Sequence, residues 1–343
     1  MPLEGEITMS IISNKDDKEG FLDLQNKQVP CPKSQQEFAI DVLIGLSQPS
    51  KWLPSKYIYD ERGSALFQQI MELPEYYLTN CETEILHTYK EKILEKIGKQ
   101  KINLVELGAG NGEKTTILLK EMIEKDFDVT FIPIDISAAA LDVFSESLKK
   151  QIPELKVKGI VSEYFKGIRW LSNLNHSTNV ILFLGSNIGN FEPSAANVFL
   201  SSLWNACNDG DYVLIGFDRK KDINLLLKAY NDSQGITAQF NLNLLRRINK
   251  ELGGNFDLDG FKYYSTFDAI SGAIKSYLIS RKKQSVVIEE LNRLFSFKSW
   301  EAIHTESSYK FLIDDTLKLA KKNGFIVIDN FSDAGNYFVD ALW

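Results

Sequence analysis

The chain has 343 residues, of which 44% are hydrophobic and 25% are charged, and its net charge is −7. This composition is typical of a globular protein with one large domain or two intimate domains. The acidic balance disfavours a nucleic-acid partner. Cys31, Cys81 and Cys207 are far apart and form no CxxC pair, so we expect reduced thiols, no disulfide framework and no metal site.

Residues 1–20 are polar and carry no periodic pattern, so we expect a flexible tail there. This segment has no basic region followed by an apolar run, as a secretory signal would have. No later stretch approaches the roughly 20 apolar residues of a membrane span. The sequence therefore predicts a cytoplasmic protein without a membrane partner.

Residues 34–89 show apolar residues at helical spacing, most clearly over 35–46 and 64–71. The segment between these two helices is rich in aromatic residues. The motif at 73–77 contains a proline and ends the helical pattern.

From residue 103 onward, short apolar strands alternate with helices. We expect strands at 103–107, 129–134, 155–161, 179–184 and 212–216, and helices at 113–125, 138–150 and 193–206. Strands that alternate with helices of this length predict an α/β fold with a mostly parallel sheet and helices on both faces.

Residues 222–310 interrupt the alternation. They contain expected helices at 225–230 and 241–252, and expected strands at 263–267, 272–280 and 304–309. A helix at 313–323 and strands at 324–330 and 337–342 follow, and the turn-rich connection predicts a terminal antiparallel hairpin. We therefore expect two discontinuous domains with a ligand cleft between them. The sheet domain takes 81–220 and 311–343, and an α+β accessory domain that binds the substrate takes 21–80 and 221–310.

A glycine-rich loop, Gly108-Ala109-Gly110-Asn111-Gly112, follows the first strand and opens a helix, as in nucleotide-binding folds. A Walker loop and a dinucleotide fingerprint would each need a glycine where Glu113 stands. S-adenosylmethionine has no phosphate and needs only a close approach of the backbone, which these glycines permit. The loop therefore favours S-adenosylmethionine over the two phosphate-bearing ligands.

Acidic residues follow the next two strands. Asp135 comes 27 residues after Gly108, where a carboxylate can accept hydrogen bonds from a ribose diol or cap the next helix. Glu163 and Tyr164 follow the third strand, where the carboxylate can accept from an adenine amino group and the ring can pack on the base.

The loop at 185–191 follows the fourth strand, at the edge of the sheet where open α/β folds bind ligands. Gly185 would allow an acceptor molecule to approach the methyl donor. Asn190 could donate a hydrogen bond to a carboxylate, or it could cap the helix at 193–206.

Several tyrosines and one acidic strand complete the candidate acceptor site. The tyrosines are Tyr57, Tyr59, Tyr76, Tyr77 and Tyr230, which could hold a polar substrate or pack in the core. Alternation along a strand places Glu306 and Ser308 on one face. A carboxylate and a hydroxyl suit the two ring nitrogens of an imidazole, although a solvated strand face would look the same.

An ordered series of short motifs runs from about residue 49 to the C-terminus. The motifs are KYIYD (56–60), LPEYY (73–77), VELG (105–108), EKT (113–115), FLGSNIGN (183–190), AY (229–230), GIT (235–237), FN (240–241), NFDLD (255–259) and TESS (305–308). Together they resemble the histidine Nα-methyltransferase family of ergothioneine biosynthesis. No single motif is specific, but the ordered series is.

The resemblance implies a Rossmann-like methyltransferase fold. It also implies an enzyme that uses S-adenosylmethionine to convert a free amino acid, L-histidine, a small-molecule substrate, into its trimethyl betaine, hercynine. It implies a donor site of Gly108, Gly110, Lys114, Asp135, Glu163 and Tyr164. It assigns the substrate carboxylate to Asn190 and Tyr230, the imidazole to Glu306 and Ser308 with Tyr76 alongside, and the surroundings of the amine to Tyr59, Gly185 and Thr237. We expect a monomer.

Two positions depart from the family pattern. Glu163-Tyr164 stands where the family often has Asp-Phe, and Ser276 stands where it can have a methionine beside the acceptor ring. One alternative is a relative that acts on another amino acid, such as a tryptophan derivative, but Glu306 and Ser308 argue against an indole. The other is a non-catalytic donor-binding or scaffold protein, against which the full set of acceptor residues argues.

Overall fold

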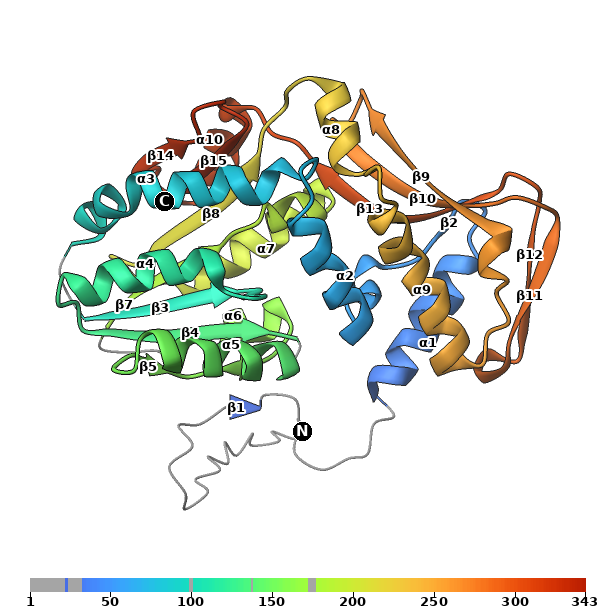
Figure 1. Cartoon of the computed structure of the whole chain (residues 1–343), viewed down its shortest axis with the longest axis horizontal. Coiled ribbons are helices and arrows are strands. Elements are labelled where there is room, and N and C mark those ends of the chain that lie inside the picture. Colours follow the sequence, from blue (N-terminus) through green and yellow to red (C-terminus); the bar gives the residue numbers. More distant parts are fainter. Residues whose placement is uncertain (1–21, 24–32, 99–100, 137, 172–176) are drawn as a thin grey trace, which may run out of the picture. The chain divides into compact units, whose positions relative to one another are not determined.

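A computed structural model of the chain describes residues 22–23, 33–98, 101–136, 138–171 and 177–343 (Figure 1). The tail expected at 1–20, Cys31 and His176 lie outside the described residues. The chain forms two compact units. The first contains Glu91–Leu182 and Asn205–Val213, with residues 22–23, and the second contains residues 33–90, Phe183–Trp204 and Leu214–Trp343. The domain boundaries expected from the sequence remain a prediction.

The first unit holds a parallel sheet in the order β1-β6-β4-β3-β7, with β5 beside β4. The strands are β1 (Leu22–Asp23), β3 (Ile102–Leu107), β4 (Val129–Asp135), β5 (Lys156–Val157), β6 (Ile160–Val161) and β7 (Thr178–Phe183). Parallel neighbours need crossover connections, and the helices α4 (Glu113–Glu124), α5 (Ala138–Gln151) and α6 (Tyr164–Leu171) lie in them. Figure 1 shows these helices alongside β3 and β4.

The apolar runs of β3 and β4 explain why they become central strands. Leu104, Val105, Phe131 and Ile132 are at most 1% exposed, so side chains on both faces of the sheet are covered. Near-continuous apolar strands are typical of parallel sheets with helices on both faces. The expected α/β architecture is therefore present in this unit.

The second unit contains the terminal hairpin. β14 (Asp329–Ser332) pairs antiparallel with β15 (Phe338–Leu342), which pairs antiparallel with β8 (Tyr212–Asp218). The predicted hairpin is confirmed, but the strand expected at 324–330 is wrong over residues 324–328. Ile326 is 77% exposed, and regular pairing begins at Asp329. α3 (Tyr77–Ile97), α7 (Pro193–Ala206) and α10 (Ile313–Lys322) are the other helices of this region.

A second sheet has the order β2-β13-β10-β9. Its strands are β2 (Lys51–Trp52), β9 (Phe261–Asp268), β10 (Ala273–Ser280) and β13 (Ala302–Tyr309). The long helix α9 (Ile236–Leu252) packs against β9, β10 and α2 (Glu61–Met71). α1 (Lys33–Leu46) and α8 (Ile223–Ala229) complete this layer. It is the α+β part that the sequence predicts.

The sequence patterns missed some elements of both units. The strand expected at 155–161 is two short strands, β5 and β6, and helix α6 after it was not predicted. The hairpin of β11 (Gln284–Ile288) and β12 (Arg293–Phe297) was also missed. Helix α9 begins at Ile236, five residues before the expected helix, after a left-handed N-cap at Gly235.

Gly112 provides a test of the loop that opens α4. Its φ is 66°, and a Cβ there would lie 1.7 to 2.3 Å from ring atoms of Phe144. The Gly112→Ala variant should lose about 2 kcal/mol or more of unfolding free energy, because left-handed backbone strain and overpacking add together. Urea denaturation measures the loss.

Gly210→Ala is the matched control. Gly210 also has a left-handed φ of 88°, but within the described chain no atom lies within 4 Å of its Cβ position. That variant should lose only about 1 kcal/mol, from backbone strain alone. Equal losses in the two variants would contradict the packing argument.

Candidate active site

A cavity in the second unit collects the acceptor residues expected from the sequence. It is lined by Tyr59, Phe67, Ile70, Tyr76, Leu78, Gly185, Ser186, Asn187, Asn190, Ala229, Tyr230, Thr237, Phe240, Glu306 and Ser308. All eight residues assigned to the acceptor and the amine are among them. They come from segments up to 249 positions apart, from Tyr59 to Ser308. The structure places these residues around one cavity, and the roles expected for them remain predictions.

The loop after β7 forms one side of the cavity. Gly185 and Ser186 have φ values of 73° and 55°, and a short 3-10 helix, η2 (Asn187–Asn190), follows. The backbone N–H of Gly185 donates to both carboxylate oxygens of Glu82, at 2.8 and 2.9 Å. Glu82 is fully buried on α3 and fixes this loop. Helix α7 begins at Pro193, so its N-cap position falls on Glu192 and not on Asn190.

Aromatic rings form another side. Tyr59 packs edge-to-face on Phe67 and on Phe240, with ring centroids 5.6 and 5.2 Å apart. Tyr76 meets the ring of Tyr230 at 6.4 Å. Such contacts hold flat apolar faces in fixed positions. Burial raises the pKa of both Tyr76 and Tyr230, so their hydroxyls stay protonated and can donate.

Glu306 introduces a carboxyl group into this apolar surface. It lies on β13 opposite Ser276, next to a β-bulge, a feature common beside active sites. Burial raises the pKa of Glu306 to about 7, although the positive charge of Lys310 opposes this. Among the described residues, no side chain forms a hydrogen bond with its carboxyl group. Its hydrogen-bonding capacity is therefore available to a ligand.

Two hydroxyl groups lie on the same cavity. The Ser308 hydroxyl is 2.8 Å from the hydroxyl of Tyr230 and accepts from the Lys310 ammonium at 2.8 Å. The Thr237 hydroxyl is buried near the Asp232 carboxylate. Thr237 also lines the cavity, so its hydroxyl can meet a polar ligand there. Alternation did place Glu306 and Ser308 on one face, as predicted.

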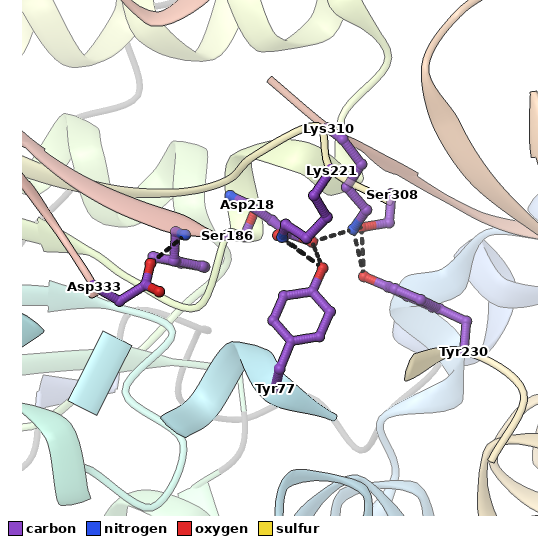
Figure 2. Close-up of polar contacts among 9 residues, drawn as sticks. Tyr77, Ser186, Asp218, Lys221, Tyr230, Ser308, Lys310 and Asp333 are labelled. Atoms are coloured by element: carbon purple, nitrogen blue, oxygen red, sulfur yellow. Dashed lines mark hydrogen bonds and ion pairs between the residues drawn. The ribbon is translucent and has the colours of Figure 1, made fainter. Parts of the chain in front are cut away.

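A network of buried charges lies beside the cavity (Figure 2). Asp218, the last residue of β8, is fully buried and pairs with Lys310 at 2.8 Å and closely with Lys221. Tyr77 donates to the same carboxylate at 2.8 Å. The backbone N–H of Asp218 donates to the Ser186 hydroxyl at 2.9 Å. The sequence did not point to Asp218, Lys221 or Lys310, because no motif marks them and Lys310 lies far along the chain from Asp218.

The donor residues expected from the sequence lie in the first unit. The Gly110 N–H donates to the Asp135 carboxylate at 3.2 Å, and the Tyr164 hydroxyl would lie 2.6 Å from a Cβ at Gly108. Lys114 stands in the first turn of α4, and Glu163 is exposed just before α6. The structure thus joins Gly108, Gly110, Asp135 and Tyr164 into one group.

This group fits S-adenosylmethionine. The Cβ position of Gly110 has no atom of the described chain within 4 Å, and its φ of 53° favours glycine. The loop therefore has room for a ligand beside its backbone. Asp135 ends β4 and provides a carboxylate at the edge of the sheet, as ribose binding requires.

Residues 38–343 match the family model of histidine-specific, S-adenosylmethionine-dependent methyltransferases. The chain belongs to this family. The match covers both units and the motifs from residue 56 onward. It confirms the methyltransferase fold class, the enzyme class and the methyl donor expected from the sequence.

Several proteins of known name are similar to the chain. The histidine N-alpha-methyltransferase of Mycolicibacterium smegmatis is 36% identical over 79% of this chain and 83% of its own length. The ergothioneine biosynthesis protein 1 of Schizosaccharomyces pombe is 31% identical over 81% of this chain, which spans 37% of that protein. The 4-dimethylallyltryptophan N-methyltransferase of Claviceps fusiformis is 27% identical over 79% of this chain and 81% of its own length.

The described residues include no membrane-spanning helix and no metal site. Across them, no helix is long and apolar enough to cross a bilayer. Their His, Cys, Asp and Glu side chains form no group able to hold a metal ion.

The raised pKa of Glu306 predicts how stability depends on pH. In the unfolded chain its carboxyl ionises near 4.5, and in the folded protein near 7. Between these values the unfolded state has lost a proton that the folded state keeps, so stability should fall as pH rises from 4.5 to 7. Glu306→Gln should remove up to about 3 kcal/mol of that fall. Urea denaturation at pH 5 to 8 measures it.

Glu301→Gln is the control of opposite sign. Burial tends to raise the pKa of Glu301, but the Lys51 ammonium at 2.6 Å holds it below its ordinary value. Its ion pair therefore stabilises the fold at neutral pH, and the substitution should lower stability there. If Glu306→Gln and the unmodified protein shared one pH profile, the buried carboxyl would not be the cause.

Proposed function

We propose that this protein transfers methyl groups from S-adenosylmethionine to the α-amino nitrogen of free L-histidine. The observation that carries the proposal is the pair Glu306 and Ser308 on one wall of the cavity. The unpartnered carboxyl of Glu306 can accept from one ring nitrogen, and the Ser308 hydroxyl can donate to the other. A buried site that hydrogen-bonds a polar ring discriminates strongly against rings that lack those groups.

The remaining cavity residues would hold the amino-acid end. Asn190 and Tyr230 can both donate to a carboxylate, and Tyr230 stays protonated because burial raises its pKa. Tyr59, Gly185 and Thr237 would surround the amine. The Thr237 hydroxyl could accept a hydrogen bond from the amine N–H and so orient the lone pair of the nitrogen.

S-adenosylmethionine, when bound, supplies an electrophilic methyl group that already carries its leaving group. The work left to the protein is to position and desolvate the amine. Asp135 would hold the ribose, Glu163 and Tyr164 the adenine, and Gly108, Gly110 and Lys114 the methionine moiety. No strong base lies among the residues that line the cavity besides Glu306, so Tyr59 and ordered water would relay the proton of the amine.

The second candidate acceptor is a tryptophan derivative, since the relative from Claviceps fusiformis is named for one. Ser276, the position that suggested a changed ring wall, is 2% exposed and its hydroxyl lies 3.1 Å from that of Tyr263. It is not among the residues that line the cavity. An indole would also leave the Ser308 hydroxyl without a ring nitrogen to donate to, because the indole nitrogen is a donor only. We therefore favour histidine and three methylations of one nitrogen. A cytoplasmic monomer stays a prediction.

A pool experiment tests the acceptor. The protein is incubated with S-adenosylmethionine and an equimolar pool of the twenty common amino acids, and products are identified by mass spectrometry. We expect histidine to gain 42 mass units, about the mass of three CH₂ groups in a trimethyl betaine. A product derived mainly from another amino acid, or no product at all, would reject the proposal.

Two substitutions test the division of labour. Glu306→Ala should weaken histidine binding about tenfold or more, because a hydrogen bond to a charged group is lost. Asp135→Ala should abolish binding of S-adenosylhomocysteine. Each variant is the control for the other ligand, and titration calorimetry measures both affinities. The ribose assignment fails if Asp135→Ala binds S-adenosylhomocysteine normally, and the imidazole assignment fails if Glu306→Ala binds histidine normally.

A further inference from the structure

Lys310 is a fully buried lysine next to the acceptor cavity. Its ammonium donates to the Asp218 carboxylate at 2.8 Å, to the Tyr230 hydroxyl at 2.7 Å and to the Ser308 hydroxyl at 2.8 Å (Figure 2). An ammonium group has three N–H donors, so these partners use all of them. Lysine is almost never fully buried unless it is paired. The arrangement therefore fixes the orientation of Lys310, and the Asp218 carboxylate supports its charge against burial, which lowers its pKa.

The Asp218 carboxylate is in contact with two lysines at once. Lys310 and Lys221 both bond to this single carboxylate, which gives two cations and one anion when both lysines are protonated. Burial lowers the pKa of Lys221 to about 8, which still leaves it protonated at pH 7. The third group on the carboxylate, Tyr77, is a neutral donor. The carboxylate of Asp218 is therefore shared between two ammonium groups, and the carboxyl of Glu306 also interacts with the charge of Lys310.

Tyr230 connects this charge with the cavity. Because Lys310 donates to the phenol oxygen, the proton of Tyr230 must point elsewhere, to Ser308 or into the cavity. Burial keeps the pKa of Tyr230 high, so that proton is retained. A hydroxyl that accepts from a cation becomes a stronger donor, because chains of hydrogen bonds polarise one another. Such a donor favours an anionic partner over a neutral one.

We propose that Lys310 is a positioning residue that supplies the counter-charge of the acceptor's carboxylate through the hydroxyl of Tyr230. The inference rests on the proposed function, which assigns the carboxylate to Tyr230. It adds a specificity: the cavity selects free amino acids with an ionised carboxylate and rejects amines that carry the same ring without it. Lys310 does not line the cavity itself, and it acts only through its neighbours.

The test compares L-histidine with L-histidinol, which has the same ring and amine but a CH₂OH group in place of the carboxylate. Titration calorimetry in the presence of S-adenosylhomocysteine gives both dissociation constants, and their ratio is the readout. In Lys310→Met the preference for histidine should fall about tenfold or more, the size expected when a hydrogen bond to a charged group is lost. Any effect of Lys310 on Glu306 changes both ligands alike and cancels in the ratio.

Lys221→Met is the matched control. It removes the same charge from the same carboxylate, but among the described residues Lys221 contacts Tyr77 and Asp218 and forms no hydrogen bond with Tyr230 or Ser308. Its ratio should stay within about twofold of the unmodified protein, because only the charge in contact with Tyr230 passes through the hydroxyl. If Lys310→Met fails to fold, Lys310→Gln replaces it. Gln keeps a neutral donor but no charge, and the same fall is expected.

The outcomes separate the two proposals. If the unmodified protein binds neither ligand, the proposed function fails. If it prefers histidine and the lysine variants weaken both ligands by the same factor, Lys310 has only a structural role and the inference is overturned. A fall of the ratio in Lys221→Met as large as in Lys310→Met would also overturn it. The effect would then come from losing either positive charge beside Asp218, and not from the contact between Lys310 and Tyr230. A selective fall in the Lys310 variants supports the inference.

Discussion

The ion pair between Asp218 and Lys310 ties the end of β8 to the segment that follows β13. Backbone hydrogen bonds reinforce this connection, since Phe311 donates to the Asp218 carbonyl and Lys220 donates to that of Phe311, both at 2.9 Å. The Asp218 N–H also holds the Ser186 hydroxyl, and with it the loop that begins at Gly185. Removing one partner of such a pair would leave a buried charge and cost about 3–5 kcal/mol. Two sides of the acceptor cavity, the loop at Gly185 and the strand with Glu306 and Ser308, are therefore tied to this one interaction.

Around that pair, the cavity combines charged groups with an aromatic lining. Tyr76 and Tyr230 keep their protons because burial raises their pKa values, and burial raises the pKa of Glu306 to about 7. Perturbed groups of this kind are frequent at functional sites, because apolar surroundings make each polar contact with a ligand stronger. Burying these groups lowers the stability of the fold, and the hydrogen bonds that Lys310 and Glu82 make behind the lining partly offset this loss.

The donor group follows a different logic. Gly108, Gly110, Asp135 and Tyr164 all lie in the first unit, within one stretch of chain that forms successive βα elements. Each comes at the carboxyl end of a parallel strand or directly after it, where such sheets bind ligands. The geometry of this group is local, which is why spacing along the sequence could predict it. The acceptor residues, in contrast, come from distant helices, loops and strands.

The amino-acid sequence by itself determined the α/β alternation, the glycine loop with Asp135, the terminal hairpin and, through ordered motifs, the family. These features are local, because strand and helix periodicities and loop chemistry act over a few residues. It also placed Glu306 and Ser308 on one face, since alternation along a strand is local too. Only the tertiary structure revealed Lys310, Asp218 and Glu82 as partners of the site. Long-range packing brings these residues together. It excludes water, and buried charged groups are stable there only when they are paired.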